Sequence, residues 1–487
     1  MDSLLINICF FLDSSRKDKC NEFINEFLEI FIFIVNSQLI FLIFFLIIFF
    51  VYKIIFINNR ENNDKIIFSS GIFFLYIFII LNFRTNIPWV DDWKWIENLQ
   101  LNRLSTIEWL FEPANIHNIF FIKLVFLFID KFLNLNFEIF SFLSILILFI
   151  ISLIVLNKEK NLEKIYLILI VLLIFSGKQF ANISQASNIA WSVCFFYIVS
   201  FRYLIIKNQI LSSLLILIAP STFGLGYLIP MYVIFLIYFS QLSKIIKINY
   251  LIISIFSIFV SIYMPQIFFP DIIASNTNLN FVSIFSNYKF YLTFFGVLSN
   301  VYLPWINGFA YLGFIIGLIQ IIIILTYLLK SYNKIGIQAF KNFFNENYFI
   351  IVGIIFALIV SITRADAQTI VAARYSVGSI IFQIGFWIYF SKNQIYIKSS
   401  NRILIKLLIL YVFLSGIFFP YQGIHWQAKR SFENNKVMSC FRDNSPFDLC
   451  AENSYQILFY NGKWYKYEDF VFQLKVLREN KKSFLNY

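Results

Sequence analysis

Charged residues are scarce in this sequence, and their scarcity excludes a soluble globular fold. Only 14% of the 487 residues are charged, whereas 60% are hydrophobic. A soluble chain of this length has no means of hiding so much apolar surface. The hydrophobic residues gather in runs that approach the ~20 residues needed to cross a bilayer core. We therefore predict an all-α polytopic membrane protein with about 10–12 transmembrane helices.

Cysteine and histidine are also rare, which argues against common metal and redox proteins. None of the five cysteines forms a CxxC pair, so a zinc or redox motif is not expected. Cys440 and Cys450 share a polar tail and would form a disulfide if that tail is external. A signal peptide of the usual form is absent, because Leu4–Leu12 is short and basic residues follow it. We interpret residues 1–36 as an N-terminal appendage.

The net charge of +12 does not indicate a nucleic-acid partner. The basic residues stand in short loops beside the predicted spans, and no basic helix or repeated aromatic platform is present. Membrane lipids are the expected surroundings, in the cytoplasmic (inner) membrane. The clearest predicted spans are Gln38–Tyr52, Ile66–Phe83, Phe137–Leu156, Tyr250–Met264, Leu312–Leu329 and Ile403–Phe419.

The distribution of Lys and Arg predicts which loops face the cytoplasm. The basic loops are residues 53–65, 158–164, 202–207, 244–247, 330–341 and 392–406. The segments between them are then external: residues 84–116, 178–189, 220–227, 266–287, 363–376 and the tail from 421. His117–Leu133 and Tyr288–Leu303 are apolar too, but counting them as crossings inverts the later loops. We interpret both as lateral, tilted or re-entrant helices.

Three regions follow from this pattern. The N-terminal appendage precedes a transmembrane domain, residues 37–420, whose first external loop is 84–116. Residues 421–487 form a charged and aromatic tail, which we expect to be a small external α/β or α cap. Asn461-Gly462 indicates a turn in this tail, and Tyr467–Lys482 an amphipathic helix.

The first external loop contains an acidic pair, Asp91-Asp92, surrounded by Trp89, Trp93 and Trp95. One interpretation is an aromatic belt at the membrane interface with two solvated acids. The other is a carboxylate held at the membrane boundary as a general base or metal ligand. Adjacent acids repel one another, which separates their pKa values and suits proton transfer. Two acids with one histidine could also hold a divalent cation.

Other polar residues in the predicted external segments are candidates for ligand binding. His117 opens an apolar helix, where it either faces a polar cavity or is a satisfied structural residue. Arg364 and Arg374 stand outside against the positive-inside trend, where each charge near the membrane interior costs ~2.5–3.5 kcal/mol. They either hold a phosphate or pyrophosphate or pair with nearby acids such as Asp366. A polar loop contains Gln179, Asn182, Gln185 and Asn188, and helix breakers interrupt Pro220–Pro230.

The order of these features resembles the GT-C superfamily of membrane glycosyltransferases, over roughly Ile66 to Pro420. Bacterial members have an Asp-Asp-Trp loop, a Pro-His-Asn-Glu-His-Arg motif and a late Arg-Tyr pair. Asp91-Asp92-Trp93 matches the first element and Ala373-Arg374-Tyr375 the third. Pro113–Asn118 matches the second only in Pro113, Asn115 and His117. The expected Glu is Ile116, so Glu108 or Glu112 would have to stand in. Phe223–Tyr227 resembles a small-residue turn of the same proteins.

The resemblance implies transfer of a sugar from a polyprenyl-phosphate donor to a cell-envelope glycan, lipid or protein. Asp91 or Asp92 would then deprotonate the acceptor hydroxyl. The implied substrate-binding residues are Trp93, Glu112, Asn115, His117, Gln185, Arg364, Arg374 and Tyr375. No cofactor is certain, and a divalent cation on Asp91 and Asp92 stays open. Two alternatives also stay open: a transporter or flippase of lipid-linked saccharides, and a non-catalytic assembly protein for envelope polysaccharides.

Overall fold

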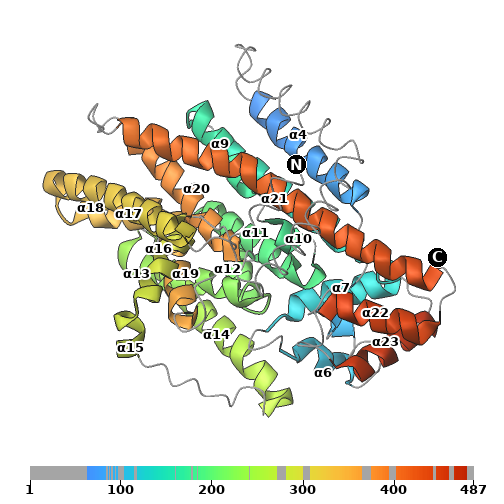
Figure 1. The fold of residues 1–487 in the computed structure, drawn as a ribbon. Coiled ribbons are helices and arrows are strands. Elements are labelled where there is room, and N and C mark those ends of the chain that lie inside the picture. Colours follow the sequence, from blue (N-terminus) through green and yellow to red (C-terminus); the bar gives the residue numbers. More distant parts are fainter. Residues whose placement is uncertain are drawn as a thin grey trace, which may run out of the picture.

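A computed structural model describes most of the chain after residue 62 (Figure 1). The described residues are 63–83, 86, 88, 92–93, 95–96, 104–113, 118–159, 161–176, 179–183, 185–240, 242–270, 281–299, 308–364, 375–393, 402–442, 446–459 and 466–479. Within these ranges the chain is helical and contains no strand. The predicted all-α architecture is thus confirmed for this part, and the predicted span Gln38–Tyr52 and the turn Asn461-Gly462 lie outside it.

Four of the predicted spans are confirmed as long apolar helices: α4 (Asn63–Asn82), α8 (Glu138–Lys158), α14 (Lys244–Phe268) and α17 (Gly308–Ile335). A fifth candidate span is the pair α18 (Gln338–Glu346) and α19 (Tyr348–Arg364), which bends by 83°. By length and composition, the described residues therefore contain four helices that can cross a membrane, or five with the bent pair. The chain has the build of a multi-pass membrane protein.

Most of the remaining helices are shorter than these spans, and α21 is longer. α7 (Phe120–Phe132) and α16 (Tyr288–Ser299) have 13 and 12 residues. At 1.5 Å per residue α7 is too short to cross a ~30 Å bilayer core, as expected for a lateral or re-entrant helix, whereas α16 is described only as far as Ser299 and its prediction stays open. The others are α6 (Thr106–Phe111), α9 (Lys164–Ile174), α10 (Phe180–Ile183), η2 (Ala186–Asn188), α11 (Ile189–Leu204), α12 (Gln209–Ile218), η3 (Gly224–Tyr227), α13 (Leu228–Phe239), α15 (Phe281–Ser286), α20 (Ser376–Asn393), α21 (Arg402–Arg442), α22 (Phe447–Phe459) and α23 (Tyr467–Glu479).

α14 shows the surface pattern of a helix that faces lipid. Its inward face carries small polar side chains, Ser254, Ser257 and Ser261, at helical spacing. Its outward face carries exposed apolar residues such as Ile252 (59% exposed) and Phe256 (56%). A helix of a soluble protein would show the opposite arrangement. Small polar residues on the inner face allow close packing between helices in a membrane.

α21 is a single helix of 41 residues that extends beyond the predicted span Ile403–Phe419. It continues through Pro420, where the sequence suggested that the external tail begins, and ends at Arg442. At 1.5 Å per residue its length is ~60 Å, about twice the thickness of a bilayer core. Figure 1 shows it crossing the whole molecule and ending beside α22 and α23.

The described residues form two large hydrophobic cores, both of which include side chains of α21, and a small third cluster of Ile284 and Phe290. The larger one fills the helix bundle with side chains from α4, α8, α9, α11, α13, α19 and α20. The second one joins the first external loop to the C-terminal tail. Its members include Trp93, Trp109 and Phe126 from the loop and α7, and Phe470 and Leu474 from α23. The tail is therefore packed on the first loop as an α cap, and the predicted helix at Tyr467 is confirmed as α23.

The predicted external segments meet at one end of the bundle, which we call the outer end. Asp92 contacts the backbone at Ala186 and Ser187, and the Phe121 N–H donates to the Ser221 carbonyl at 3.4 Å. Ring contacts bring in the remaining segments. Phe111 of the first loop stacks on Phe268 at the end of α14, and Trp93 contacts Phe470 of the tail. Trp191 at the start of α11 contacts both Phe223 and Tyr375. All six segments predicted to be external are linked in this way.

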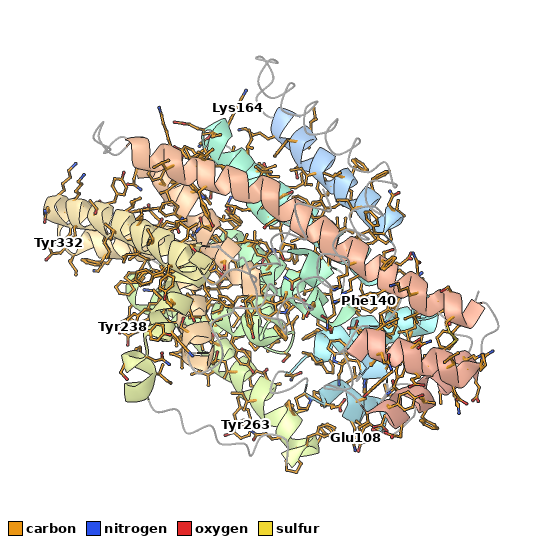
Figure 2. The ribbon with its side chains drawn as sticks, viewed as in Figure 1. Glu108, Phe140, Lys164, Tyr238, Tyr263 and Tyr332 are labelled. Carbon is orange, nitrogen blue, oxygen red and sulfur yellow. A yellow bond between two sulfur atoms is a disulfide. The ribbon has the colours of Figure 1, made fainter. Side chains whose placement is uncertain are left out.

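The predicted cytoplasmic loops meet at the opposite, inner end. Arg202 donates to the Asn345 and Glu346 carbonyls. Lys392 forms an ion pair with Glu159 at 3.2 Å. Lys247 donates to the Ser240 carbonyl. Figure 2 shows Lys164 and Tyr332 on the side of the molecule away from Glu108 and Tyr263. Cys440 and Cys450, at the outer end, form the predicted disulfide between α21 and α22. Disulfides persist in oxidising compartments, so the prediction that this end is extracytoplasmic depends on the bond forming in the cell.

Candidate functional site

Asp92 closes the N-terminal end of a helical segment from a distant part of the chain. Its side chain is 1% exposed, and its carboxylate accepts hydrogen bonds from the Ser187 N–H at 2.8 Å and the Ala186 N–H at 3.4 Å. Both N–H groups belong to η2, which leads directly into α11. The first N–H groups of a helix lack partners within it, and the helix dipole favours a negative charge there. Asp92 is therefore a buried clamp, which excludes the interpretation of a solvated acid.

Trp93 anchors the first loop to the cap. Its side chain is buried, and its indole N–H donates to the Pro88 carbonyl at 2.9 Å. Its ring meets the Phe470 ring edge-on, with 4.9 Å between the centroids. This surrounding excludes a position in a lipid-facing aromatic belt. Trp95 is also buried, against Phe126 of α7.

The polar loop before α11 is buried beside the Asp92 clamp. Its side chains form two amide pairs, in which Asn182 donates to Gln179 at 2.9 Å and Asn188 donates to Gln185 at 3.1 Å. Gln185 also donates to the Ser187 hydroxyl at 2.9 Å, next to the backbone N–H that Asp92 binds. All four amide side chains are less than 10% exposed. Burying amides is costly, and these two hydrogen bonds offset part of that cost, while the Gln179 amide nitrogen is buried without an acceptor among the described residues.

Aromatic rings cover the first turn of α11. The Trp191 ring meets Tyr375 edge-on at 5.3 Å between centroids and meets Phe223 at 4.8 Å. Tyr375 immediately precedes α20 and follows Arg374 in the sequence. Gly226 allows this packing, because a Cβ at that position would lie 1.9 Å from the Ala219 carbonyl oxygen. The structure thus brings Asp92, Trp93, Gln185 and Tyr375 of the predicted site to the same end of the bundle.

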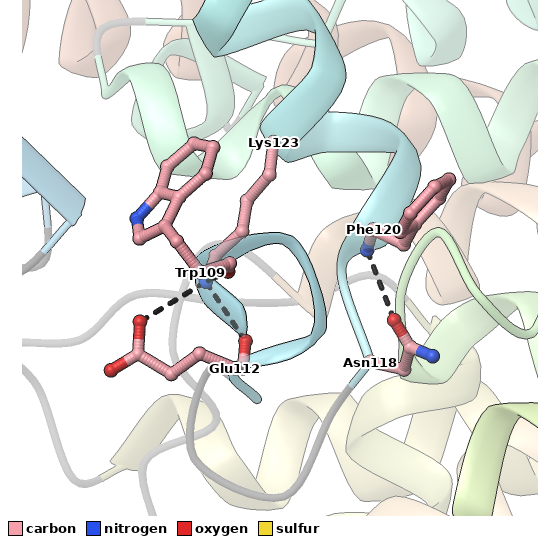
Figure 3. A network of polar contacts seen from close by, with 5 residues as sticks. All are labelled: Trp109, Glu112, Asn118, Phe120 and Lys123. Carbon is pink, nitrogen blue, oxygen red and sulfur yellow. Dashed lines mark hydrogen bonds and ion pairs between the residues drawn. The ribbon is translucent and has the colours of Figure 1, made fainter. Parts of the chain in front are cut away.

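Glu112 belongs to a compact ionic network with Lys123 and Trp109 (Figure 3). Lys123 is 1% exposed although it lies on the apolar helix α7. Its ammonium group donates to the Trp109 carbonyl, to the Glu112 carbonyl at 2.9 Å and to the Glu112 carboxylate at 3.1 Å. It also lies 4.7 Å from the centroid of the Trp109 ring. Burial lowers the pKa of the Lys123 ammonium to about 8, against the opposing effect of the Glu112 carboxylate.

These bonds give Lys123 a defined structural role. The last carbonyl groups of a helix lack partners, and a cation near them is favoured by the helix dipole. Trp109 and Glu112 stand at the C-terminal end of α6. Lys123 therefore caps α6 and fastens it to α7. Glu108, the other carboxylate considered, forms a capping box with Ser105 at the opposite end of α6, which lowers its pKa.

Asn118 and the outer half of α21 complete the described part of this end. Asn118 is buried, and its side chain accepts from the Phe120 N–H at 3.0 Å at the start of α7.

On α21, Gln427 and Arg430 are buried, and Gln427 donates to the Phe83 carbonyl at 2.9 Å. Both were missed by the sequence analysis. Their signal was the spacing of Gln427, Arg430, Ser431 and Asn434 along one helical face, within the segment that we expected to form the external cap.

Several predicted site residues lie outside the described residues, namely Asp91, Asn115, His117 and Arg374. Arg364 is the last residue of α19. In the described part of the chain, no group of three His, Cys, Asp or Glu side chains is arranged to hold a metal ion. No protein-family model, curated protein or solved structure matches this chain. The resemblance to GT-C enzymes therefore stays a prediction.

Proposed function

We propose that the protein is a membrane glycosyltransferase that works at the outer face of the cytoplasmic membrane. It takes a sugar from a polyprenyl-phosphate donor and transfers it to a glycan, lipid or protein of the cell envelope. The observation that carries this proposal is the outer end itself. Six segments that are distant in sequence converge there around buried polar groups.

The two acids of the first loop take different roles in this proposal. Asp92 is a positioning residue, because its oxygens bind the N–H groups of η2. Asp91 is then the catalytic base. It accepts the proton of the acceptor hydroxyl while the hydroxyl oxygen bonds to the anomeric carbon. The bond from that carbon to the phosphate oxygen breaks, and the phosphate leaves with the electron pair. Arg364 and Arg374 bind the departing phosphate.

The test is sugar transfer in membranes that contain the Asp91→Asn variant. General-base help is worth ~10²–10⁴-fold, so we expect transfer to fall by at least about 100-fold. Glu479→Gln is the matched control, since Glu479 is an exposed carboxylate at the end of α23 in the same cap. Equal rates for both variants would contradict the role of Asp91. Absence of transfer by the wild-type chain would contradict the activity itself.

A divalent cation on the acidic pair is a separate part of the proposal. Treating wild-type membranes with a chelator and then adding Mg²⁺ tests it. Transfer that is lost and then restored supports a cation on Asp91 and Asp92. Transfer that survives chelation places the reaction on the protein's own side chains.

Transport of lipid-linked saccharides is the second candidate function, and one observation favours it. Gln320 of α17 and Gln383 of α20 are 1% exposed within the apolar bundle and donate to each other at 2.9 Å. Polar groups inside a membrane often mark a pathway. Gln383 also donates to the Leu298 carbonyl at the end of α16, so the pair equally serves as a cap for that helix. A transporter would move a fluorescent lipid-linked saccharide across vesicles of the Asp91→Asn variant, whereas an enzyme would not.

A further inference from the structure

The four most exposed large hydrophobic side chains of the described residues come from neighbouring segments at the inner end. They are Ile210 (76% exposed), Tyr238 (76%), Ile206 (72%) and Ile245 (72%). They belong to the turn before α12, the first turn of α12, the last turn of α13 and the first turn of α14. α12 and α13 both pack along α14, and the Tyr250 hydroxyl donates to the Ile205 carbonyl at 3.0 Å. Figure 2 shows Tyr238 on the side of the molecule where Tyr332 lies, away from Glu108.

The hydrophobic surface continues from this place along two helices. The exposed side chains on and before α12 lie at helical spacing, and they are Ile206, Ile210, Leu214 and Leu217. On α14 the exposed face begins at Ile245 and includes Ile252 and Phe256. Contiguous exposed hydrophobic surface of this kind marks contact with a membrane or a partner.

Two exposed cations stand among these side chains. Lys207 precedes α12, and Lys244 is the first residue of α14. We call Lys207 and Lys244, together with Ile206, Ile210, Tyr238 and Ile245, the α12 corner. Residues 164–270 contain no Asp or Glu, and neither ammonium group forms an ion pair within the part of the chain that the structure describes. Lys392 at the same end differs, because its side chain is 54% exposed but pairs with Glu159 at 3.2 Å.

The helices themselves do not favour these two cations. The N-terminus of a helix is the positive end of its dipole, and both lysines stand at such an end. Lys392 instead lies in the last turn of α20, where the dipole favours a cation. The α12 corner therefore combines positive charge, which the described residues do not neutralise, with an exposed hydrophobic face.

We propose that the α12 corner binds the headgroup of an anionic phospholipid in the leaflet at the inner end. The ammonium groups of Lys207 and Lys244 bind its phosphate, and its acyl chains lie on the exposed faces of α12 and α14. A zwitterionic phospholipid has the same phosphate but also carries an ammonium group, which the two lysines repel. A second copy of this chain is a poor occupant, because a symmetric contact would bring the same lysines together.

The experiment titrates phospholipid into the purified chain in detergent micelles and follows the unfolding temperature. Dioleoyl phosphatidylglycerol is the anionic probe, and dioleoyl phosphatidylcholine is the zwitterionic probe with the same acyl chains. Binding to the folded state raises the unfolding temperature, and the wild-type chain should need less of the anionic lipid for the same rise. Lys207→Gln and Lys244→Gln should each raise the required amount of phosphatidylglycerol about 5-fold, the effect of one cation near an anionic membrane surface. The response to phosphatidylcholine should not change.

Three controls accompany these variants. Lys392→Gln also removes an exposed lysine at the inner end, and it should leave the response to phosphatidylglycerol within about twofold of wild type. Replacing Lys207 and Lys244 together by arginine keeps both charges and should keep the wild-type response. Glycerol 3-phosphate, which has the phosphate without acyl chains, should not raise the unfolding temperature at the same concentration.

The outcomes decide the proposal in either direction. A loss of response that follows the removal of charge at the α12 corner alone supports it. The proposal is refuted if phosphatidylcholine stabilises the wild-type chain as strongly as phosphatidylglycerol does, or if Lys392→Gln loses as much response as Lys207→Gln. It is also refuted if glycerol 3-phosphate stabilises the chain equally well, or if the arginine variant loses the response. None of these measurements involves sugar transfer, so the result does not depend on the proposed function.

Discussion

At each end of the bundle a charged side chain caps a helix, and the two charges have opposite signs. At the outer end the Asp92 carboxylate binds the N–H groups at the start of η2. At the inner end the Arg202 guanidinium donates to the Asn345 and Glu346 carbonyls at the end of α18, and the Tyr232 hydroxyl donates to Phe344. Each charge matches the sign that the helix dipole favours.

The difference lies in what surrounds each charge. Around Arg202 the bond to the Glu346 carbonyl lies at the surface, where water can replace it. Around Asp92 the chain buries four amide side chains and a second hydrophobic core that includes the cap. Closing one helix end requires none of these. The outer end therefore buries more polar groups than the capping of one helix requires, and this is the difference on which the proposed function depends.

The largest expected effect is on activity, and it distinguishes Asp92 from Arg202. In Asp92→Asn the amide oxygen still accepts from the Ser187 N–H. The amide NH₂ group then faces the Ala186 N–H, so two donors meet, and the negative charge is lost. We expect sugar transfer to fall about 10-fold or more through misplacement of the first loop. Arg202→Gln should keep transfer within about twofold per folded molecule. Similar losses in both variants would show that the ends do not differ in function.

The next effect concerns stability and compares two lysines. Lys123→Met leaves the Glu112 carboxylate and two carbonyls at the end of α6 without their cation. Breaking a buried ion pair typically costs about 3–5 kcal/mol, and we expect a value near 3 because Glu112 is partly exposed. Lys341 of α18, exposed at the inner end, should tolerate the same change within about 0.5 kcal/mol. Unfolding in bicelles measures both, and equal losses would contradict the assignment of Lys123.

The pH dependence of stability offers a sign test for the same lysine. The Lys123 pKa is about 8 in the folded chain and 10.5 when unperturbed. Between these values the unfolded state binds more protons than the folded state, so stability rises with pH. At about 1.4 kcal/mol per pKa unit, the gain from pH 8 to pH 10.5 is about 3 kcal/mol. Lys123→Met should lack this increment, and a slope of the same size in the variant would assign it to other groups.

The sequence predicted features that depend on local pattern. Hydropathy located α4, α8, α14 and α17, and described parts of the segments predicted to be external contact one another at one end. The shared polar tail of Cys440 and Cys450 predicted their disulfide. The predicted spans were found because the thickness of the bilayer and the charge asymmetry across it constrain each segment separately.

The missed features depend on contacts between distant segments. Asp92 and Ser187 are 95 positions apart, so nothing near Asp92 shows that it caps a helix. Lys123 lies near the start of an apolar helix, and its partner Glu112 precedes it by 11 positions, outside that helix. The end of the span near Pro420 was placed by a fall in hydropathy. Backbone hydrogen bonding does not depend on hydropathy, and α21 continues past Pro420 to Arg442.

The smallest effect concerns the disulfide and decides which end is external. Replacing Cys440 and Cys450 by serine removes a cross-link over a separation of 10 residues, which should destabilise the cap by about 2–3 kcal/mol. In a background with Cys9 and Cys20 replaced by serine, a membrane-impermeant maleimide should label the two cysteines of intact cells only after reduction. Cys194, buried in α11, should stay protected. Labelling that requires permeabilised cells would place the cap in the cytoplasm. The end with the buried polar groups would then face the cytoplasm, and a donor presented outside could not reach it.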